Sequence, residues 1–507
     1  MSGDLVIGVD VGSQGTCAQL IDQSGKLLAA SYVAHELSYP RPGWAEQDAR
    51  QWVTALAQAL HEVVQKIRPE RVDAIAFASQ LDGLVAVDGA CEPVRPAMIW
   101  MDRRADVECE EVAKRIDPER LRQISGCNLD ASHVAAKIAW LCKHEADAHR
   151  DCRSYLLPGA YVAYKASGVL AIDPSNASST MLLDVRSRTW SSEACAAFDV
   201  DPDRLPPILA PHSVLGPVAP WLREASGLSA STMIVLGCGD EMAGTLGAGV
   251  VEPGDVCDVM GTAEPVCAVT DVPLHDPSGV VELHPHADPE SWLLENPGWL
   301  SGGAYRWFRD HLGEGEIAEA ERAGSDVYEL LNAVAAEAPP GADGLVWLPA
   351  LAGAMTPEWN ARARATWFGL TPAHGRSHML RALLEGNALA LRDVLGAIRD
   401  TGRDVNELVC VAGGAKGRLG LQIRADVTGV PVSRPDDVET TARGAAMLAA
   451  VGAGMYGTVR EAGHAMAPPR VDRIEPDPAN SAVYDELHGR YRELYAALRP
   501  LFDTLPA

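Results

Sequence analysis

The chain opens with Leu5-Val6-Ile7-Gly8-Val9-Asp10-Val11-Gly12-Ser13-Gln14-Gly15-Thr16, the stretch that decides the fold. The apolar run from Leu5 to Val9 has the length and composition of a buried strand, and the glycines and hydroxyls that follow are typical of a turn. A second strand is expected over Cys17 to Ile21, and a third over Leu27 to Val33 after the turn at Ser24-Gly25. The sequence therefore predicts a β-hairpin with Asp10 at the end of its first strand.

A similar pattern occurs in the second half of the chain. Asp255 to Met260 reads as a strand, Gly261-Thr262-Ala263-Glu264 as a turn, and Pro265 to Val269 as a strand. Apolar strands at Val72 to Ala78 and Met233 to Leu236, with an amphipathic helix over 51–66, predict an α/β architecture. The two hairpins, about 250 residues apart, suggest two similarly built lobes with a cleft between them. A chance recurrence of a β-hairpin pattern would explain the similarity of the two stretches equally well.

Length and charge narrow the class of protein. A chain of 507 residues exceeds one ordinary core, so two domains are expected. Its 43 Lys+Arg against 69 Asp+Glu give a net charge of −26, which argues against binding to nucleic acid or to an anionic membrane. There is no apolar run of the ~18 residues that span a bilayer, and no basic, apolar secretory signal is read at the start. A globular cytoplasmic protein is the expectation.

The cysteines and the C-terminal half add further expectations. The eleven cysteines form no Cys-x-x-Cys pair, so neither a disulfide framework nor a zinc site is expected, and buried free thiols are. A long helix is predicted over 375–399 and an amphipathic helix over 481–499. The Pro-rich stretch 467–478 reads as a linker.

Four glycine-containing turns could hold a phosphate, because small residues let backbone N–H groups approach an anion. They are Gly12-Ser13-Gln14-Gly15-Thr16, Gly261-Thr262, Gly302-Gly303 and Gly413-Gly414-Ala415-Lys416. A single glycine turn after a strand is more often just a turn. Together, at strand ends in two lobes, they make a nucleotide site plausible. Asp10 and Asp240 end strands beside such turns, where a carboxylate can face a ligand crevice or simply cap a turn.

Taken together, these motifs resemble the FGGY carbohydrate kinases of the sugar kinase, actin and heat-shock ATPase superfamily, and xylulokinases most of all. The matching stretches run in the right order along nearly the whole chain. They include Ile7 to Ser13, Gly43 to Asp48, Pro96 to Arg104, Lys137 to Trp140, Gly239-Asp240, Gly261-Thr262, Gly302 to Phe308, Phe368 to Leu370, Leu384 to Asp393, Gly413 to Lys416, Gln422 to Gly429 and Arg443 to Ala446.

The resemblance implies two actin-like (ribonuclease H-like) lobes, 1–247 and 248–507, closing on a sugar and Mg-ATP. Asp240 would be the catalytic base, and Asp10 would lie near the magnesium ion and the transferring phosphate. The phosphate turns would be Gly12-Ser13 and Gly261-Thr262, and the nucleotide would be lined by Gly302, Gly303, Gly413, Gly414, Ala415 and Lys416. Leu81, Asp82 and Asp102 would lie around the sugar. Homodimers are common among such kinases, so a homodimer is an expectation.

Two departures from the xylulokinase pattern affect the expected substrate. Xylulokinases usually have Gln-Met-His-Gly where this chain has Gln80-Leu81-Asp82-Gly83, and Asn where it has Glu241. Two carboxylates in place of a His and an amide remove donors and add acceptors, unless Asp82 or Glu241 turns away to a local partner. The expected function is phosphorylation of a pentulose such as D-xylulose to its 5-phosphate. The alternatives are another ketose or polyol (ribulose, xylitol, a tetritol), a non-catalytic sensor, or an actin-like filament protein.

Overall fold

The first half of the chain forms a mixed β-sheet with the strand order β11-β12-β5-β1-β2-β3, and β13 also pairs with β5. The computed structural model describes residues 4–505. The strands are β1 (Leu5–Val11), β2 (Gly15–Asp22), β3 (Leu27–Ala34), β5 (Val72–Ser79), β11 (Val214–Pro217), β12 (Met233–Val235) and β13 (Cys238–Gly239). β1 is antiparallel to β2 and parallel to β5. The predicted opening hairpin and the strand near 72–78 are confirmed.

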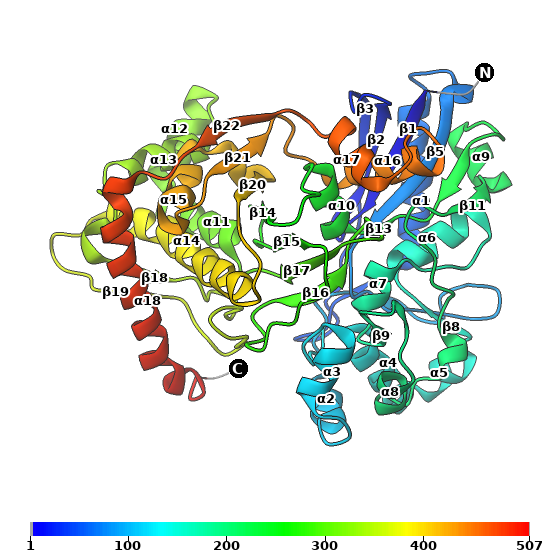
Figure 1. The fold of residues 1–507 in the computed structure, drawn as a ribbon, viewed down its shortest axis with the longest axis horizontal. Helices are drawn as coiled ribbons and strands as arrows, with labels where there is room; N and C mark the ends of the chain where they lie inside the picture. The colour runs from blue at the N-terminus through cyan, green and yellow to red at the C-terminus, as the bar shows by residue number, and fades with distance from the viewer. Residues whose placement is uncertain (1–3, 506–507) are drawn as a thin grey trace.

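The second half forms a sheet of the same design, with the order β16-β17-β15-β14-β20-β21-β22. Its strands are β14 (Asp255–Val259), β15 (Val266–Thr270), β16 (Glu282–Pro285), β17 (Trp292–Asn296), β20 (Glu407–Val411), β21 (Val432–Pro435) and β22 (Arg470–Ile474). β14 is antiparallel to β15 and parallel to β20, as β1 is to β2 and β5. The two similarly built lobes are therefore confirmed, and they lie side by side in Figure 1.

The Pro-rich stretch 467–478 is not a linker, which corrects the interpretation from composition. Its central residues form β22, which pairs antiparallel with β21 at the edge of the second sheet. The prolines lie outside Arg470–Ile474, so they remove no donor from this ladder. Two-residue and three-residue strands complete the structure in pairs: β4 (Glu46–Gln47) with β7 (Ala97–Met98), β6 (Val85–Val87) with β8 (Ser154–Leu156), β9 (Leu183–Asp184) with β10 (Thr189–Trp190), and β18 (Val346–Leu348) with β19 (Thr366–Phe368).

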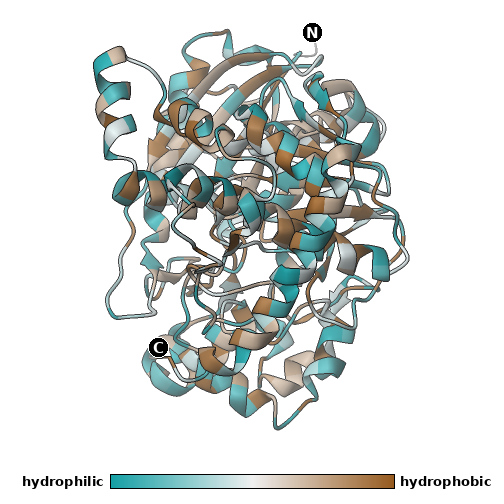
Figure 2. Ribbon diagram, turned by 90° about the vertical axis from the view of Figure 1, so that its left-hand side faces the viewer, coloured by the Kyte–Doolittle hydropathy of each residue, from teal (hydrophilic) through white to brown (hydrophobic). Residues whose placement is uncertain are grey.

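Helices cover both sheets. Those of the first half are α1 (Ala49–Val64), α2 (Asp106–Val112), α3 (Pro118–Ser125), α4 (Val134–His144), α5 (Ala146–Asp151), α6 (Pro158–Ser167), α7 (Pro174–Ser178), α8 (Ser192–Ala197), α9 (Pro220–Ser226) and α10 (Asp240–Gly247). Those of the second are α11 (Ser301–Leu312), α12 (Glu314–Ala323), α13 (Val327–Ala336), α14 (Arg376–Asp400), α15 (Arg418–Thr428), α16 (Thr441–Gly452), α17 (Val459–Met466) and α18 (Ser481–Phe502). Teal and brown alternate along the outer helices in Figure 2, as amphipathic helices require.

Helices α10 and α16 join the lobes through glycines that allow close approach. A Cβ on Gly444 of α16 would lie 1.8 Å from the Ala243 carbonyl oxygen of α10, and a Cβ on Gly8 of β1 would lie 1.7 Å from that of Ala442. These helices, α17 and residues of β1, β5, β14, β15 and β20 share one apolar core. Helices α16 and α17, which the division at residue 247 assigns to the second lobe, thus pack on the first sheet. The division itself stays a prediction.

Candidate active site

Two carboxylates from distant parts of the chain meet at one edge of the first sheet. In the parallel pairing of β1 with β5, Asp10 lies opposite Ala78. On the other side of β5, Cys238 of β13 also lies opposite Ala78, and Asp240 follows two residues later as the first residue of α10. With neighbouring strands about 4.8 Å apart, Asp10 and Cys238 are separated by about 10 Å. The sheet therefore brings together the two acids that the sequence singled out.

The Asp10 carboxyl is suited to a cation. Burial first, and the Glu439 carboxylate second, raise its pKa to about 7. Its Oδ1 is buried and has no hydrogen-bond partner among residues 4–505. A buried carboxylate oxygen without a donor is costly unless a positive charge or a donor reaches it. The residue thus fits the role of holding a magnesium ion near a phosphate.

The Asp240 carboxyl has the environment of a proton acceptor. Its pKa is raised well above the ordinary value by burial, by the neighbouring Glu241 carboxylate and by Asp10. Its Oδ1 accepts a 3.1 Å hydrogen bond from the Glu241 backbone N–H at the start of α10. Raised carboxyl pKa values are one way in which enzymes tune a general base toward neutral pH. The position can therefore take a proton from a substrate hydroxyl.

A cavity of about 560 Å³ in the second lobe contains most of the predicted nucleotide residues. The predicted residues that line it are Gly261, Thr262, Gly302, Gly413, Gly414 and Lys416. Its volume lies within the range for small-molecule and cofactor sites. Sequence reasoning missed other residues of its wall, which include Tyr305, Arg306, Tyr328, Asn332 and Asn387. Aromatic side chains can stack on the base of a nucleotide, and amide side chains can form hydrogen bonds with it.

Three glycine turns form one wall of this cavity by packing on each other. A Cβ on Gly302 would lie 2.2 Å from the Gly261 carbonyl oxygen, and one on Gly414 would lie 2.8 Å from the Met260 carbonyl oxygen. The Gly414 N–H donates to Met260 O at 2.9 Å. These glycines are required by close backbone approach, which the sequence alone could not distinguish from ordinary turns.

A buried ionic network supports the same wall. Arg424 of α15 donates to Asp258 of β14 at 2.8 Å and to Glu264 at 2.6 Å, and all three side chains are nearly fully buried. Removing one partner from such a network costs about 3–5 kcal/mol. Arg424 holds the turn between β14 and β15 in place. Its one sequence signal is a charge on the buried face of an amphipathic helix.

Four other predicted nucleotide residues lie outside the wall of this cavity. The Gly303 N–H donates to Thr262 O at 3.0 Å, and Ala415 is fully buried. In the first lobe, the Gly12 N–H donates to Gly15 O at 3.0 Å, and Ser13 Oγ accepts from Trp100 Nε1 at 2.9 Å. The turn at Gly12-Ser13 directly follows Asp10 on the first sheet. Its role as a phosphate turn stays a prediction.

The residues expected near the sugar have different surroundings. Leu81 packs closely on Gly239, whose Cβ would lie 2.5 Å from Leu81 Cδ2. Asp82 has a positive φ of 59° and accepts a 2.8 Å hydrogen bond from His133 Nδ1. Burial and the carboxyl of Glu295, which also shares a hydrogen bond with Glu241, raise the pKa of Glu241 well above its usual range. Asp82 and Glu241 therefore belong to a buried group of acids and histidines.

Asp102 is oriented by the protein itself. Arg104 donates to both of its carboxylate oxygens, at 2.8 and 2.6 Å, and the Ala45 N–H donates to Oδ2 at 2.7 Å. The Asp102 side chain has no exposed surface. In this conformation it fixes the loops around Arg104 and Ala45, and its carboxylate is not accessible from outside. The expected contact with a sugar stays a prediction.

A two-lobed α/β fold with paired acids at strand ends and a glycine-walled cavity is typical of the actin-like ATPase superfamily. Residues 5–247 match the N-terminal domain of the FGGY family of carbohydrate kinases, and residues 258–453 match the C-terminal domain. The chain belongs to this family, and it is an ATP-dependent sugar kinase. None of the helices between residues 4 and 505 is both long and apolar enough to cross a membrane.

Relatives cover the chain from end to end. The xylulose kinase of Escherichia coli (strain K12) is 30% identical over 500 residues, covering 98% of this chain and 100% of that protein. The autoinducer-2 kinase of Salmonella typhimurium is 32% identical over 515 residues, covering 99% and 96%. The crystal structure of xylulose kinase from Rhodospirillum rubrum is 30% identical, with a TM-score of 0.90 and coverage of 98% and 100%.

Proposed function

We propose that this sugar kinase phosphorylates a pentulose with Mg-ATP, and that D-xylulose, giving the 5-phosphate, is its substrate. The full-length similarity to xylulose kinases from several bacteria carries this proposal. The alignment with an autoinducer-2 kinase at a similar identity means that family membership alone does not fix the sugar. The acceptor is a small neutral molecule, in keeping with a chain of net charge −26.

In the proposed reaction, Asp240 accepts the proton of the substrate hydroxyl as the oxygen attacks the γ-phosphorus, and the bond from the γ-phosphorus to the β,γ-bridging oxygen breaks to release ADP. Asp10 would hold a magnesium ion, which would neutralise charge on the transferring phosphoryl group when bound. The turns at Gly261 and Gly414 place backbone around the nucleotide, and Lys416 adds a positive charge to the cavity wall. Phosphoryl transfer depends mainly on positioning and electrostatic stabilisation, which these rigid turns provide.

A second candidate is a kinase for a polyol or another ketose, such as xylitol, a tetritol or ribulose. It is favoured by Asp82 and Glu241, which stand where xylulokinases usually have a histidine and an amide, although Asp82 also accepts from His133 and Glu241 shares a hydrogen bond with Glu295. Hydroxyls donate to carboxylates, whereas a ketose carbonyl needs a donor. A pocket with more acceptors therefore favours a ligand with more hydroxyl groups.

An ADP-release assay across ketoses, aldoses and polyols tests both candidates. The proposal expects the highest kcat/KM for D-xylulose and a loss of turnover when magnesium is chelated. A higher kcat/KM for a polyol than for D-xylulose would contradict the pentulose proposal and support the second candidate.

We also propose that the protein is a cytoplasmic homodimer. Cell fractionation tests the location, and analytical ultracentrifugation tests the assembly. A monomer at micromolar concentration would contradict the dimer.

A further inference from the structure

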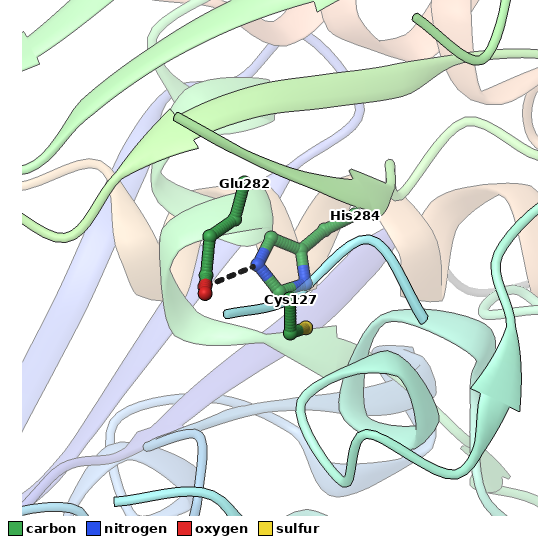
Figure 3. A group of neighbouring side chains, drawn as sticks. All are labelled: Cys127, Glu282 and His284. Carbon is green, nitrogen blue, oxygen red and sulfur yellow. Dashed lines mark ion pairs between the residues drawn. The ribbon is translucent and has the colours of Figure 1, made fainter. Parts of the chain in front are cut away.

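Three potential metal ligands meet beside the contact between the lobes. Cys127 follows α3 in the first lobe, and Glu282 and His284 are alternate residues of β16 in the second sheet. A thiol sulfur, a carboxylate oxygen and an imidazole nitrogen of these residues all lie within 4.8 Å of one another, and all three residues are buried. Figure 3 shows the three side chains converging.

The hydrogen bonds of His284 leave its Nε2 free to act as a ligand. The Ser178 hydroxyl donates to the Ser175 carbonyl oxygen at 2.7 Å, so it accepts from His284 Nδ1 at 2.8 Å. The proton of the neutral ring is therefore on Nδ1, and Nε2 carries the lone pair. Nε2 lies 3.4 Å from Glu282 Oε2. Such an outer hydrogen bond is the usual way in which a protein orients a metal-binding histidine.

A second histidine has the same arrangement. His133 Nδ1 contacts Asp82 Oδ1 at 2.8 Å and the Ser179 carbonyl oxygen at 3.1 Å, and both are acceptors, so Nδ1 carries a proton. Its Nε2 is buried, has no hydrogen-bond partner within the described part of the chain, and lies 3.5 Å from Glu282 Oε1. His133 is only 3% exposed. Nε2 therefore faces the Glu282 carboxylate at more than the usual hydrogen-bond length.

The separations in this cluster fit a shared cation better than direct hydrogen bonds. Nitrogen–oxygen hydrogen bonds are about 2.7–3.2 Å long. Zinc–nitrogen and zinc–oxygen bonds of about 2.0–2.1 Å in a tetrahedron place two ligand atoms about 3.3 Å apart. The separation of 3.4 Å between His284 Nε2 and Glu282 Oε2 is close to that edge length, whereas His133 Nε2 lies 3.5 Å from the other oxygen, Oε1.

We propose that Cys127, Glu282 and His284 form a binding site for a divalent transition-metal ion, with zinc as the first choice, and that His133 lies beside this site against the other oxygen of Glu282. Thiolate, imidazole and carboxylate ligands together suit zinc. The Cys127 thiol, which lies 3.4 Å from the Ser178 carbonyl oxygen, would lose its proton to solvent as the metal binds. The spacing of cysteines gave no such expectation, because these ligands come from three separate positions on two lobes.

Metal content and affinity test this site without reference to kinase activity. Untagged protein, purified without chelators, is assayed for zinc by mass spectrometry and then titrated with zinc against a chromophoric chelator. We expect one zinc per chain and a higher Tm with zinc than after chelation. Cobalt in place of zinc should give a thiolate charge-transfer band that Cys127→Ser abolishes.

Variants locate the metal. His284→Gln should abolish stoichiometric binding, and Ser178→Ala, which removes the outer hydrogen bond, should weaken it about 10–100-fold. Cys195→Ser, at another buried cysteine, is the matched control and should bind as wild type does. Wild-type protein that binds no zinc at micromolar concentration overturns the site and leaves a protonated His133 between two carboxylates. Equal affinity in His284→Gln and wild type also overturns it.

Discussion

Asp10 and Cys238 lie opposite the same residue, Ala78, on the two sides of strand β5. Asp240 follows Cys238 at the first turn of α10. The two acids are therefore held by one rigid sheet edge, although a large part of the first lobe separates them in sequence. Catalytic groups on such elements keep their geometry when a single side chain is changed.

Asp240→Asn should therefore keep the fold and nucleotide binding while kcat falls about 10²–10⁴-fold, because the amide cannot accept the hydroxyl proton. Steady-state kinetics with ADP detection and a calorimetric measurement of nucleotide binding separate the two effects. Asp147→Asn makes the same chemical change at a side chain that is 88% exposed, and should leave kcat unchanged. A kcat for Asp240→Asn within threefold of wild type would remove this residue from the role of base.

Gly302→Ala should raise the KM for ATP about 10–100-fold, because its Cβ would force the turn at Gly261 away from the cavity. The KM for the sugar should change far less. Gly396→Ala is the matched control, since a Cβ there meets no described atom within 4 Å and the site lies within α14. That control should keep the KM for ATP and raise stability by about 0.5–1 kcal/mol. Unchanged ATP kinetics in Gly302→Ala would contradict the position of the nucleotide.

Asp82→His should raise the ratio of kcat/KM for D-xylulose to that for xylitol, by about tenfold, since a donor replaces an acceptor at the position next to Leu81. Histidine tolerates the positive φ of 59° at this position better than most residues do. Asp199→His changes a side chain that is 74% exposed at a φ of 55°, and serves as the control. If the ratio does not move, Asp82 does not set the specificity.

Lys137 predicts a specific dependence of stability on pH. Burial lowers its pKa from 10.5 to about 8, although its Nζ donates to Asp82 O and Ile99 O at 2.6 and 2.8 Å. Between these pKa values the unfolded chain keeps a proton that the folded chain has lost, so this group makes stability rise as the pH increases from about 8 to 10.5. The full effect is about 3 kcal/mol.

Urea unfolding of wild type and Lys137→Met between pH 7.5 and 10.5 measures this contribution. The difference in unfolding free energy between the two proteins should grow with pH, and the exposed Lys66→Met variant should show no such trend. A difference that is constant with pH would mean that Lys137 titrates with its ordinary pKa in the folded protein.

The local parts of the fold and site were readable in the sequence. The strands around Asp10 and Asp255, the glycine turns and the long helix α14 depend on apolar runs, on period and on turn residues, which act over a few positions. The prediction of a linker over 467–478 was wrong, because the prolines on both sides of β22 are typical of a linker and only the five residues between them form the edge strand. The partners of Arg424, which are Asp258 and Glu264, and the contact of His133 with Glu282 gave no local signal, because side chains from distant segments form these contacts.

The sequence by itself indicated a strand–turn–strand unit in each half and which turns could hold a phosphate, and the family resemblance implied two lobes. The tertiary structure decided which of those turns form one wall of the cavity in the second lobe. It also decided that the Asp102 carboxylate binds Arg104, and that Asp10 and Asp240 lie at the same edge of the first sheet. The physical reason is that hydrogen-bond register between strands and the approach of glycines such as Gly302 to another backbone are fixed by non-local packing. No periodicity along the chain encodes which distant segment will be the neighbour.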